Sequence, residues 1–245
     1  MLTPINKETP DIVLISETKL NKRHKVHFKN YSMIGHDRLN AKQGEGTAML
    51  IENPLKFKKI QNYKITNFKI LETTIIKIKI SNKENLLITA AYATYGNQKE
   101  FNEKFNKLFE LLQLDKQENS YIITGDLNAK HTSWKDALYN TKGNFIRNWR
   151  DNKSIHCKTN LYSSELPSYP KGGSYLDICL TDARLKFQNL RPNNTLKTLN
   201  YDSDHKAIFQ INKNTSDFLT LETQTETPTL NYKKTDWKKF QNLLE

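Results

Sequence analysis

Acidic and amide side chains, together with one histidine, stand at the ends of the apolar runs of this sequence. Ligands and catalytic groups gather at strand ends because loops turn inward there while the strands stay rigid. Carboxylate and amide oxygens suit Mg²⁺ or Mn²⁺, and the Cys/His spacing that is typical of zinc does not occur. The candidate residues are Glu17, Asp126, Asn128, Asp177, Asp204 and His205.

Asp177 and His205 are the residue types of an acid–base pair. Asp177 lies between Leu176 and Ile178, where a carboxylate is costly unless it is paired. A buried carboxylate fixes the tautomer of a neighbouring imidazole and stabilises its cationic form, so Asp177 is a candidate partner for His205. The alternative is that Ser203-Asp204-His205 is an ordinary polar turn.

Asp126 and Asn128 are two residues apart and follow the apolar run Tyr121–Gly125. Side chains at this spacing face the same way in an extended segment, so both would reach one site. The alternative is an Asx turn after Gly125. Glu17 follows another apolar run and is either a metal ligand or a turn residue beside Thr18.

The chain is strongly basic, with a net charge of +12 from 38 Lys and Arg and 26 Asp and Glu. Residues 213–245 hold five Lys and five acidic residues, so residues 1–212 carry the whole excess. A basic surface attracts polyanions, although a lysine-rich surface also serves solubility alone. A basic surface around an acidic metal-binding centre points to metal-assisted hydrolysis of a phosphate ester.

Several targeting and membrane features are not expected. The mean hydropathy is −0.75, and no run of 18 apolar residues predicts a transmembrane helix. The N-terminus has no basic stretch followed by an apolar core, so we predict no signal peptide. Two cysteines do not make a disulfide framework, and a reducing compartment fits.

Periodicity predicts one α/β domain over residues 1–212, a two-layer mixed β-sandwich flanked by helices. Residues 215–229 have the composition of a linker, and Trp237–Leu244 is predicted to begin a new helix, so residues 213–245 form a separate segment. We predict strands at 12–15, 47–51, 76–80, 86–93, 121–124, 174–180 and 207–211, with helices at 101–112 and around 145–149.

Four motifs in order resemble the endonuclease/exonuclease/phosphatase family, whose fold is DNase I-like: ISETKL, TGDLNAKHTSW, GGSYLDICLTD and SDHKAI. The versions DLNAKHTSW and LDICLT are similar to endonucleases of non-LTR retrotransposons of the jockey-like kind. The segments GHDR and GEGTAML also match that group, and TDWKKF resembles the lead-in to a reverse transcriptase. The resemblance covers roughly residues 10–212.

The resemblance implies a role for each candidate. Glu17 would bind Mg²⁺ or Mn²⁺, and Asp204 would support the metal or the nucleophile. Asp126 would align the attacking water and help to deprotonate it. Asn128 would hold the scissile phosphate and the nucleophile.

Three further roles follow from the same resemblance. Asp177 would orient His205, which would contact the phosphate and act in proton transfer or in stabilising the transition state. Tyr92, in the segment AAYATYG, matches a tyrosine that touches the phosphate. Phosphorus gains negative charge as it is attacked, so a metal, an amide and an imidazolium aimed at it would stabilise the transition state.

The implied function is to nick one strand of duplex target DNA and leave a 3′-hydroxyl that primes reverse transcription. The implied partners are target DNA and, in the full-length protein, the element RNA and reverse transcriptase, acting in the nucleus. The family's first strand, which ends in an Asn near the metal, is expected to be missing, because sixteen residues precede Glu17. Two alternatives stay open: an inactive truncated remnant of that domain, and a phosphatase of the same fold.

Overall fold

The computed structural model describes residues 10–18, 26–36, 46–60, 70–94, 96–188, 190–200 and 203–209, without the side chains of residues 153–157. The predicted linker at 215–229 and the predicted helix Trp237–Leu244 lie outside these ranges, as does the division at residue 212. Among the described residues, no helix combines the length and apolar character needed to cross a bilayer.

A six-stranded mixed sheet forms the centre of the described structure, with the strand order β4-β5-β6-β7-β9-β8. All neighbours are antiparallel except β6 and β7, and a parallel pair needs a crossover, which helix α3 (Gln98–Leu112) provides. The strands are β4 (Lys58–Lys59), β5 (Leu71–Lys79), β6 (Asn85–Ala93), β7 (Asn119–Asp126), β8 (Thr159–Ser163) and β9 (Asp177–Asp182).

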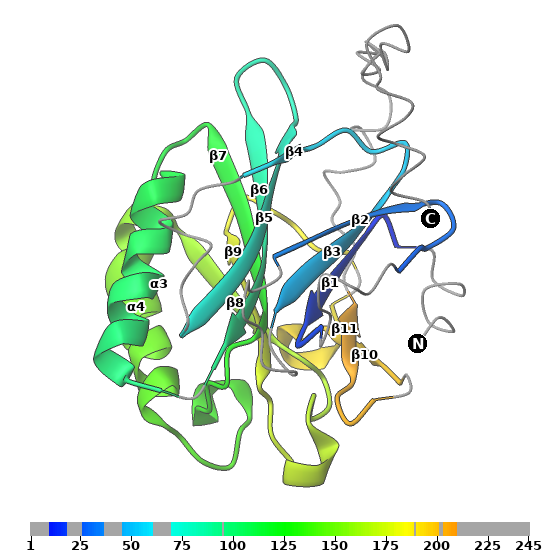
Figure 1. Ribbon diagram of the computed structural model, residues 1–245. Coiled ribbons are helices and arrows are strands. Elements are labelled where there is room, and N and C mark those ends of the chain that lie inside the picture. The colour runs from blue at the N-terminus through cyan, green and yellow to red at the C-terminus, as the bar shows by residue number, and fades with distance from the viewer. Residues whose placement is uncertain are drawn as a thin grey trace, which may run out of the picture.

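A three-stranded antiparallel sheet with the order β1-β3-β2 packs beside the large sheet (Figure 1). β1 contacts β6 and β7, which are central strands of the other sheet. A short hairpin-like pair, β10 with β11, completes the strands. The bounds are β1 (Ile12–Ser16), β2 (Tyr31–His36), β3 (Thr47–Glu52), β10 (Lys197–Leu199) and β11 (Ala207–Phe209).

Helices α3 and α4 (Thr141–Cys157) cover the face of the six-stranded sheet that is turned away from the small sheet (Figure 1). α3 begins where the Asn97 side chain accepts a hydrogen bond from Lys99 N–H at 2.9 Å, and it ends at Gln113, which has a left-handed backbone with φ 51°. Three short 3₁₀ helices follow at Thr132–Trp134, Pro170–Gly172 and Pro192–Asn194.

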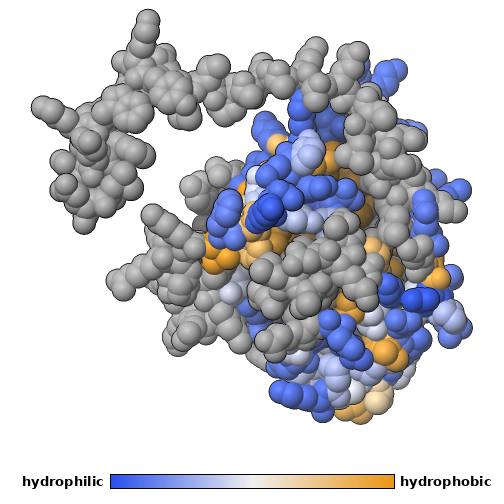
Figure 2. Space-filling view, turned by 90° about the vertical axis from the view of Figure 1, so that its right-hand side faces the viewer, coloured by the Kyte–Doolittle hydropathy of each residue, from blue (hydrophilic) through white to orange (hydrophobic). Residues whose placement is uncertain are grey.

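Successive side chains of each strand point to opposite faces of the large sheet, so the hydrophobic core has two layers. On β6, Leu87 and Ala91 face the helices and pack with the aromatic side chains of α3. Leu86, Ile88 and Ala90 face the small sheet instead. Both faces of β6 are therefore buried, which explains its continuous apolar sequence. On the face shown in Figure 2, the described surface is mainly hydrophilic, with small hydrophobic areas between.

The fold class is confirmed: an α/β protein in which two β-sheets pack together and helices flank them. All seven predicted strands and both predicted helices are present, although Ile211 lies outside the described residues. The predicted strand at 174–180 differs in its bounds: β9 begins at Asp177, so residues 174–176 precede it, and it is buried on both faces from Ile178 to Asp182. β1 is half-buried and, within the described ranges, pairs with β3 alone.

Candidate active site

Polar residues form a row across one end of the six-stranded sheet, on the face toward the small sheet. Asp126 on β7 lies directly opposite Asp177 on β9, so their side chains project from the same face. On the neighbouring strand β6, Ala90 pairs with Thr124 of β7 in a parallel ladder. Tyr92 follows Ala90 by two residues and Asp126 follows Thr124 by two residues, so both lie on the same face at the same end of the sheet. The apolar alternation of the strands thus continues into a polar row at their ends.

Gly125 allows β7 to run close to β6 immediately before Asp126. Its φ is +146°, and a Cβ at this position would lie 2.0 Å from the carbonyl oxygen of Ala91. Ser16 occupies the same region: its Oγ donates to Ala91 O at 3.3 Å and accepts from Asp126 N–H at 3.3 Å. Ser16 therefore ties the end of β1, and with it Glu17, to the end of the large sheet.

Asp126 and Asn128 form a turn rather than an extended segment. Asn128 N–H donates to Asp126 Oδ1 at 2.8 Å, and Asn128 has a left-handed φ of 47°. The Asn128 amide donates to Ala93 O at 2.9 Å. The Asx-turn alternative is thus present in the structure, and the prediction of two side chains facing the same way along an extended segment is wrong.

Asp126 is buried, and the acidic side chains of Asp177 and Glu17 lie near it. Burial, followed by the negative charge of Asp177, raises the pKa of Asp126 from its ordinary value of 3.8 to about 7. The hydrogen bond from Asn128 and the charge of His205 lower this pKa, while Glu17 raises it. Asp126 can therefore change its protonation state near neutral pH, as a general base requires.

Asp177 and His205 lie within hydrogen-bond distance, with 3.0 Å between Asp177 Oδ2 and His205 Nδ1. Ser203 Oγ accepts from His205 N–H at 3.2 Å, so His205 sits in a polar turn, as the alternative interpretation held. The ring of Tyr169 packs against the imidazole in a tilted arrangement, with 5.1 Å between the ring centroids and 41° between the ring planes. The contact with Asp177, the turn and the ring of Tyr169 together hold the imidazole in place.

The acids around His205 favour its cationic form. The hydrogen bond with Asp177 raises the pKa of His205 from 6.5 to about 9, burial opposes this, and the charges of Asp177, Asp126 and Asp204 add to it. Asp204 is exposed, and its Oδ1 lies 3.4 Å from Ser203 Oγ. His205 is therefore mainly an imidazolium at neutral pH, suited to bind an anion.

Glu17 and Tyr92 form a hydrogen bond across the two sheets, from the Tyr92 hydroxyl to Glu17 Oε1 at 2.5 Å. Burial and this bond raise the pKa of Tyr92, so the phenol stays protonated and acts as a donor. Glu17 itself is exposed and has a left-handed φ of 51°. Glu17 is therefore in a turn, as the alternative interpretation held, and its side chain reaches Tyr92 from that turn.

Ser168 is a buried residue that our sequence interpretation missed. Its Oγ accepts from Leu176 N–H at 3.0 Å and from Asp177 N–H at 3.1 Å. Its carbonyl oxygen accepts from Lys206 N–H at 2.7 Å. One residue thus holds the backbone of Asp177 and the backbone next to His205, and no local sequence pattern marks such a tertiary role.

Asn140 is a second missed residue. Its Oδ1 accepts from Lys130 N–H at 3.1 Å and from Gly143 N–H at 2.8 Å, while its Nδ2 donates to Asn128 O at 2.9 Å. It therefore caps the first turn of α4 and fixes the loop that carries Asn128. An Asn directly before the first residue of a helix is a helix-start signal, and this signal could have found Asn140. A Cβ on Gly143 would lie 1.8 Å from Lys130 O.

Lys142 brings a buried positive charge close to this loop. Its Nζ donates to Thr94 O at 2.5 Å and lies 5.4 Å from the centre of the Phe101 ring. Burial lowers the pKa of Lys142, and the charge of Asp126 partly restores it. The lysine thus helps to balance the acids at the strand ends.

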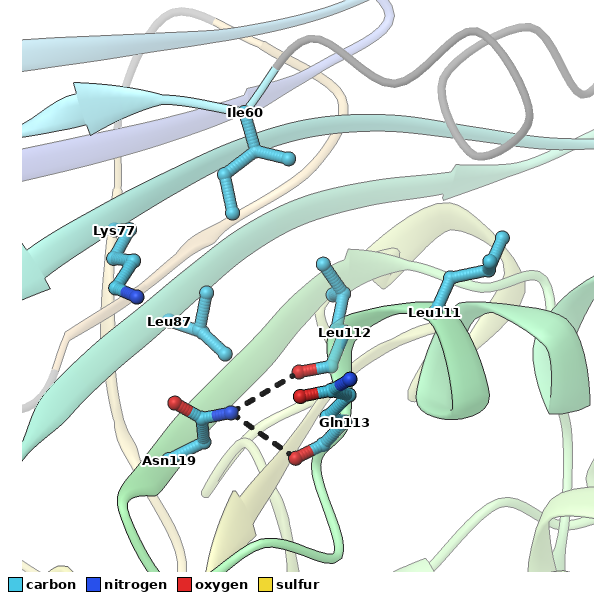
Figure 3. Close-up of a pocket in the computed structure, with 7 residues that line it drawn as sticks. All are labelled: Ile60, Lys77, Leu87, Leu111, Leu112, Gln113 and Asn119. Atoms are coloured by element: carbon cyan, nitrogen blue, oxygen red, sulfur yellow. Dashed lines mark hydrogen bonds between the residues drawn. The ribbon is translucent and has the colours of Figure 1, made fainter.

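A separate pocket lies at the C-terminal end of α3, away from these residues (Figure 3). Asn119 donates there to Leu112 O at 3.4 Å and to Gln113 O at 3.1 Å. Because these bonds satisfy the last carbonyl groups of α3, the polar contacts of this pocket are structural.

Solved structures with the same fold come from several organisms. An AP endonuclease from Leishmania major has a TM-score of 0.55 and 14% identity, covering 82% of this chain and 78% of that one. An endonuclease/exonuclease/phosphatase family protein from Leptotrichia buccalis has a TM-score of 0.56 and 12% identity, covering 86% of this chain and 90% of that one. D. rerio TDP2, solved with a single-stranded DNA product, has a TM-score of 0.51 and 13% identity, covering 85% of this chain and 88% of that one.

These identities are low, and the likeness concerns the fold, which is that of the endonuclease/exonuclease/phosphatase family. No curated protein matches the chain. Residues 86–209, half of the chain, match the family described as endonuclease-reverse transcriptase. That stretch runs from β6 to β11 and includes Tyr92, Asp126, Asn128, Asp177 and His205. The chain belongs to the endonuclease-reverse transcriptase family.

Proposed function

We propose that this protein is a metal-dependent endonuclease that nicks one strand of duplex target DNA and leaves a 3′-hydroxyl for priming reverse transcription. Its membership of the endonuclease-reverse transcriptase family supports this assignment. The reverse transcriptase and the element RNA are the partners proposed for the full-length protein, with the nucleus as its place of action.

The observation that carries the proposal is the placement of Asp126 opposite Asp177, with His205 bonded to Asp177. Asp126 would accept a proton from the attacking water, whose oxygen forms the new bond to phosphorus. The bond from phosphorus to the 3′ oxygen breaks, and that oxygen is protonated from solvent. Asp177 keeps His205 oriented and cationic, so His205 would stabilise the negative charge that grows on the phosphoryl oxygens.

Asn128 and Tyr92 would hold the substrate in place. The Asn128 amide is fixed by its bond to Ala93 O, which leaves its orientation defined before substrate arrives. The Tyr92 hydroxyl stays protonated and engaged with Glu17. We propose that both contact the scissile phosphate, in keeping with the resemblance of their motifs.

A divalent cation suits the donor set around Glu17. Glu17 and Asp177 both raise the pKa of Asp126, so negative charge is concentrated where a cation would relieve it. Within the described ranges no three His, Cys, Asp or Glu side chains are grouped to enclose an ion. Mg²⁺ is often held by one or two carboxylates, water and substrate phosphate, and a site with Glu17 as its carboxylate fits this type of coordination.

We propose Glu17 as the protein ligand of this ion, with Asp204 supporting the ion or the nucleophile. When bound, Mg²⁺ or Mn²⁺ would supply Lewis-acid stabilisation of the phosphoryl oxygens. The net charge of +12, carried by residues 1–212, would attract the phosphate backbone of DNA.

A plasmid assay tests the proposal. In Mg²⁺ the wild-type chain should convert supercoiled plasmid to the open circular form, while His205→Ala should reduce the rate by roughly a hundredfold or more. DNA binding by the variant should stay close to that of the wild type. Nicking that survives His205→Ala would contradict the role proposed for His205. Release of phosphate from a monoester without plasmid nicking would contradict the endonuclease assignment and favour the phosphatase alternative.

A further inference from the structure

Exposed hydrophobic side chains are concentrated on the loops next to the candidate active site. Among the described residues four large hydrophobic side chains are exposed: Leu138 at 66%, Tyr139 at 68%, Leu166 at 48% and Val26 at 42%. Three of these four, Leu138, Tyr139 and Leu166, lie on loops that are hydrogen-bonded to site residues or their neighbours. We call these three side chains the apolar rim. Single exposed hydrophobics need no explanation, but a group beside one site does.

The loop that carries Leu138 is held in place by a buried acid. Asp136 Oδ1 accepts from Leu138 N–H at 3.3 Å, and Asp136 Oδ2 accepts from Tyr175 N–H at 2.9 Å. Tyr175 stands two residues before Asp177, so the loop is fastened to the start of β9. Leu138 is therefore exposed on a loop whose backbone is held in place by hydrogen bonds.

Tyr139 is anchored from the other side. Its neighbour Asn140 donates to Asn128 O at 2.9 Å, and Asn140 N–H donates to Lys130 O at 3.0 Å. Tyr139 is thus one residue away from a direct bond to the loop that holds Asn128.

Leu166 stands on the loop that precedes Ser168. Glu165 N–H donates to Leu196 O at 2.8 Å, and the Glu165 side chain accepts from Thr198 N–H at 3.1 Å. Ser168, two residues later, holds the backbones of Asp177 and Lys206. Leu166 is therefore presented between two fixed points on the His205 side of the site.

The surroundings of Leu138 and Tyr139 favour an anionic partner. Between residues 127 and 150 Asp136 is the one acid, and both of its oxygens accept backbone N–H groups. Lys130 and Lys135 lie in the same loop segment, and Lys135 is exposed. A partner with negative charge and flat apolar faces matches this combination, and nucleic acid has both in its phosphates and bases.

We infer that the apolar rim packs against unstacked bases on either side of the scissile phosphate, with Leu138 and Tyr139 on one side and Leu166 on the other. This inference rests on the proposed function for the identity of the substrate as DNA. An aromatic ring offers a stacking surface to every base, and an aliphatic side chain wedges between base steps. The rim would therefore select sites where the duplex opens easily, rather than one sequence.

The test compares binding to two oligonucleotide duplexes, one fully paired and one with a two-base bulge, by fluorescence anisotropy in EDTA so that no cleavage occurs. The wild-type chain should bind the bulged duplex more tightly. The double variant Leu138→Ala/Tyr139→Ala should lose roughly tenfold or more of its affinity for the bulged duplex and little for the paired one. Tyr139→Phe, which keeps the ring, and Val26→Ala, which lies outside the rim, should both retain the preference.

Each contrary result is distinct. Equal binding of both duplexes by the wild type, or an unchanged preference in the double variant, would overturn the inference. Self-association that the double variant abolishes, without any change in DNA binding, would also overturn it and assign the rim to a protein contact. A wild type that prefers the bulge yet nicks no plasmid in Mg²⁺ would support the rim and contradict the proposed function. Unchanged thermal melting confirms that the variants are folded, as expected for exposed positions.

Discussion

Asp126 and Asp177 are direct cross-strand partners in the antiparallel ladder of β7 and β9. Like charges in this position destabilise a sheet, and Asp126 is also buried. The structure compensates part of this cost with His205, whose Nδ1 is 3.0 Å from Asp177. The remaining cost falls on Asp126, whose pKa of about 7 records how unfavourable its charged form is.

Asp126→Asn should therefore stabilise the fold while it abolishes the activity. Because the pKa of Asp126 is raised to about 7 in the folded chain, the fold favours the protonated form, and stability is lost as pH rises through 7. The amide keeps an acceptor for Asn128 N–H and cannot ionise. In EDTA at pH 8 the variant should gain roughly 2–4 kcal/mol of unfolding free energy, measured by urea titration.

The same measurement at low pH is the control for this prediction. At pH 3 the side chain at position 126 of the wild type is mostly neutral in the folded and in the unfolded chain, because this pH lies below both the ordinary pKa of 3.8 and the folded pKa of about 7, so the difference in unfolding free energy should nearly vanish. Nicking by the variant should fall by roughly a hundredfold or more. A variant that is less stable than the wild type at pH 8 would show that the charge of Asp126 is well solvated after all.

Asp177→Asn should lower the pKa of His205, because Asp177 is the first cause of its value of about 9. Histidine signals in an NMR titration should show this pKa moving toward 6.5. In the wild type, the stabilisation from the raised pKa is fully present below pH 6.5 and is lost as pH rises through 9. The variant should lack this loss between pH 7 and 9. An unchanged His205 titration would contradict the pairing.

Ser168→Ala should disturb the Asp177–His205 pair without touching either side chain. It leaves the N–H groups of Leu176 and Asp177 without their acceptor, which costs about 1–3 kcal/mol. As a positioning residue, Ser168 should affect kcat more than KM, and the His205 pKa should fall. Ser164→Ala is the matched control, since Ser164 is equally buried and its Oγ has no hydrogen-bond partner among the described residues. Equal effects of the two substitutions would reduce Ser168 to a packing role.

Asn140 can be tested by separating its two functions. Asn140→Asp keeps an acceptor for Gly143 N–H and so keeps the helix cap, but it loses the donor to Asn128 O. Its melting temperature should stay near that of the wild type, while kcat falls. Asn140→Ala should lose both the activity and about 1 kcal/mol of stability. If Asn140→Asp nicks plasmid at the wild-type rate, the bond to Asn128 O does not position that loop.

The sequence predicted those features that leave a local signature. Asp177 is recognisable as a candidate because a carboxylate interrupts an apolar run, and the spacing of apolar residues predicts α3. β8, with the sequence TNLYS, has no such pattern and is a strand because β9 supplies its partner. Ser168 and Lys142 are functional candidates only through contacts with residues distant in sequence, and no periodicity reports those contacts. Turn conformations at Glu17 and Asn128 were foreseen as alternatives, and they coexist with the site.

The last prediction concerns Mg²⁺ and Glu17, with thermal melting as the measurement so that activity is not needed. An ion that binds only the folded chain raises its stability in proportion to the logarithm of its concentration above the dissociation constant. Millimolar Mg²⁺ should raise the melting temperature of the wild type, EDTA should reverse this, and Glu17→Gln should remove most of the increase. The glutamine retains an acceptor for the Tyr92 hydroxyl, so the fold is conserved while one negative charge is lost. Equal Mg²⁺ stabilisation of both chains would exclude Glu17 as the ligand and direct attention to Asp204, which stands beside His205.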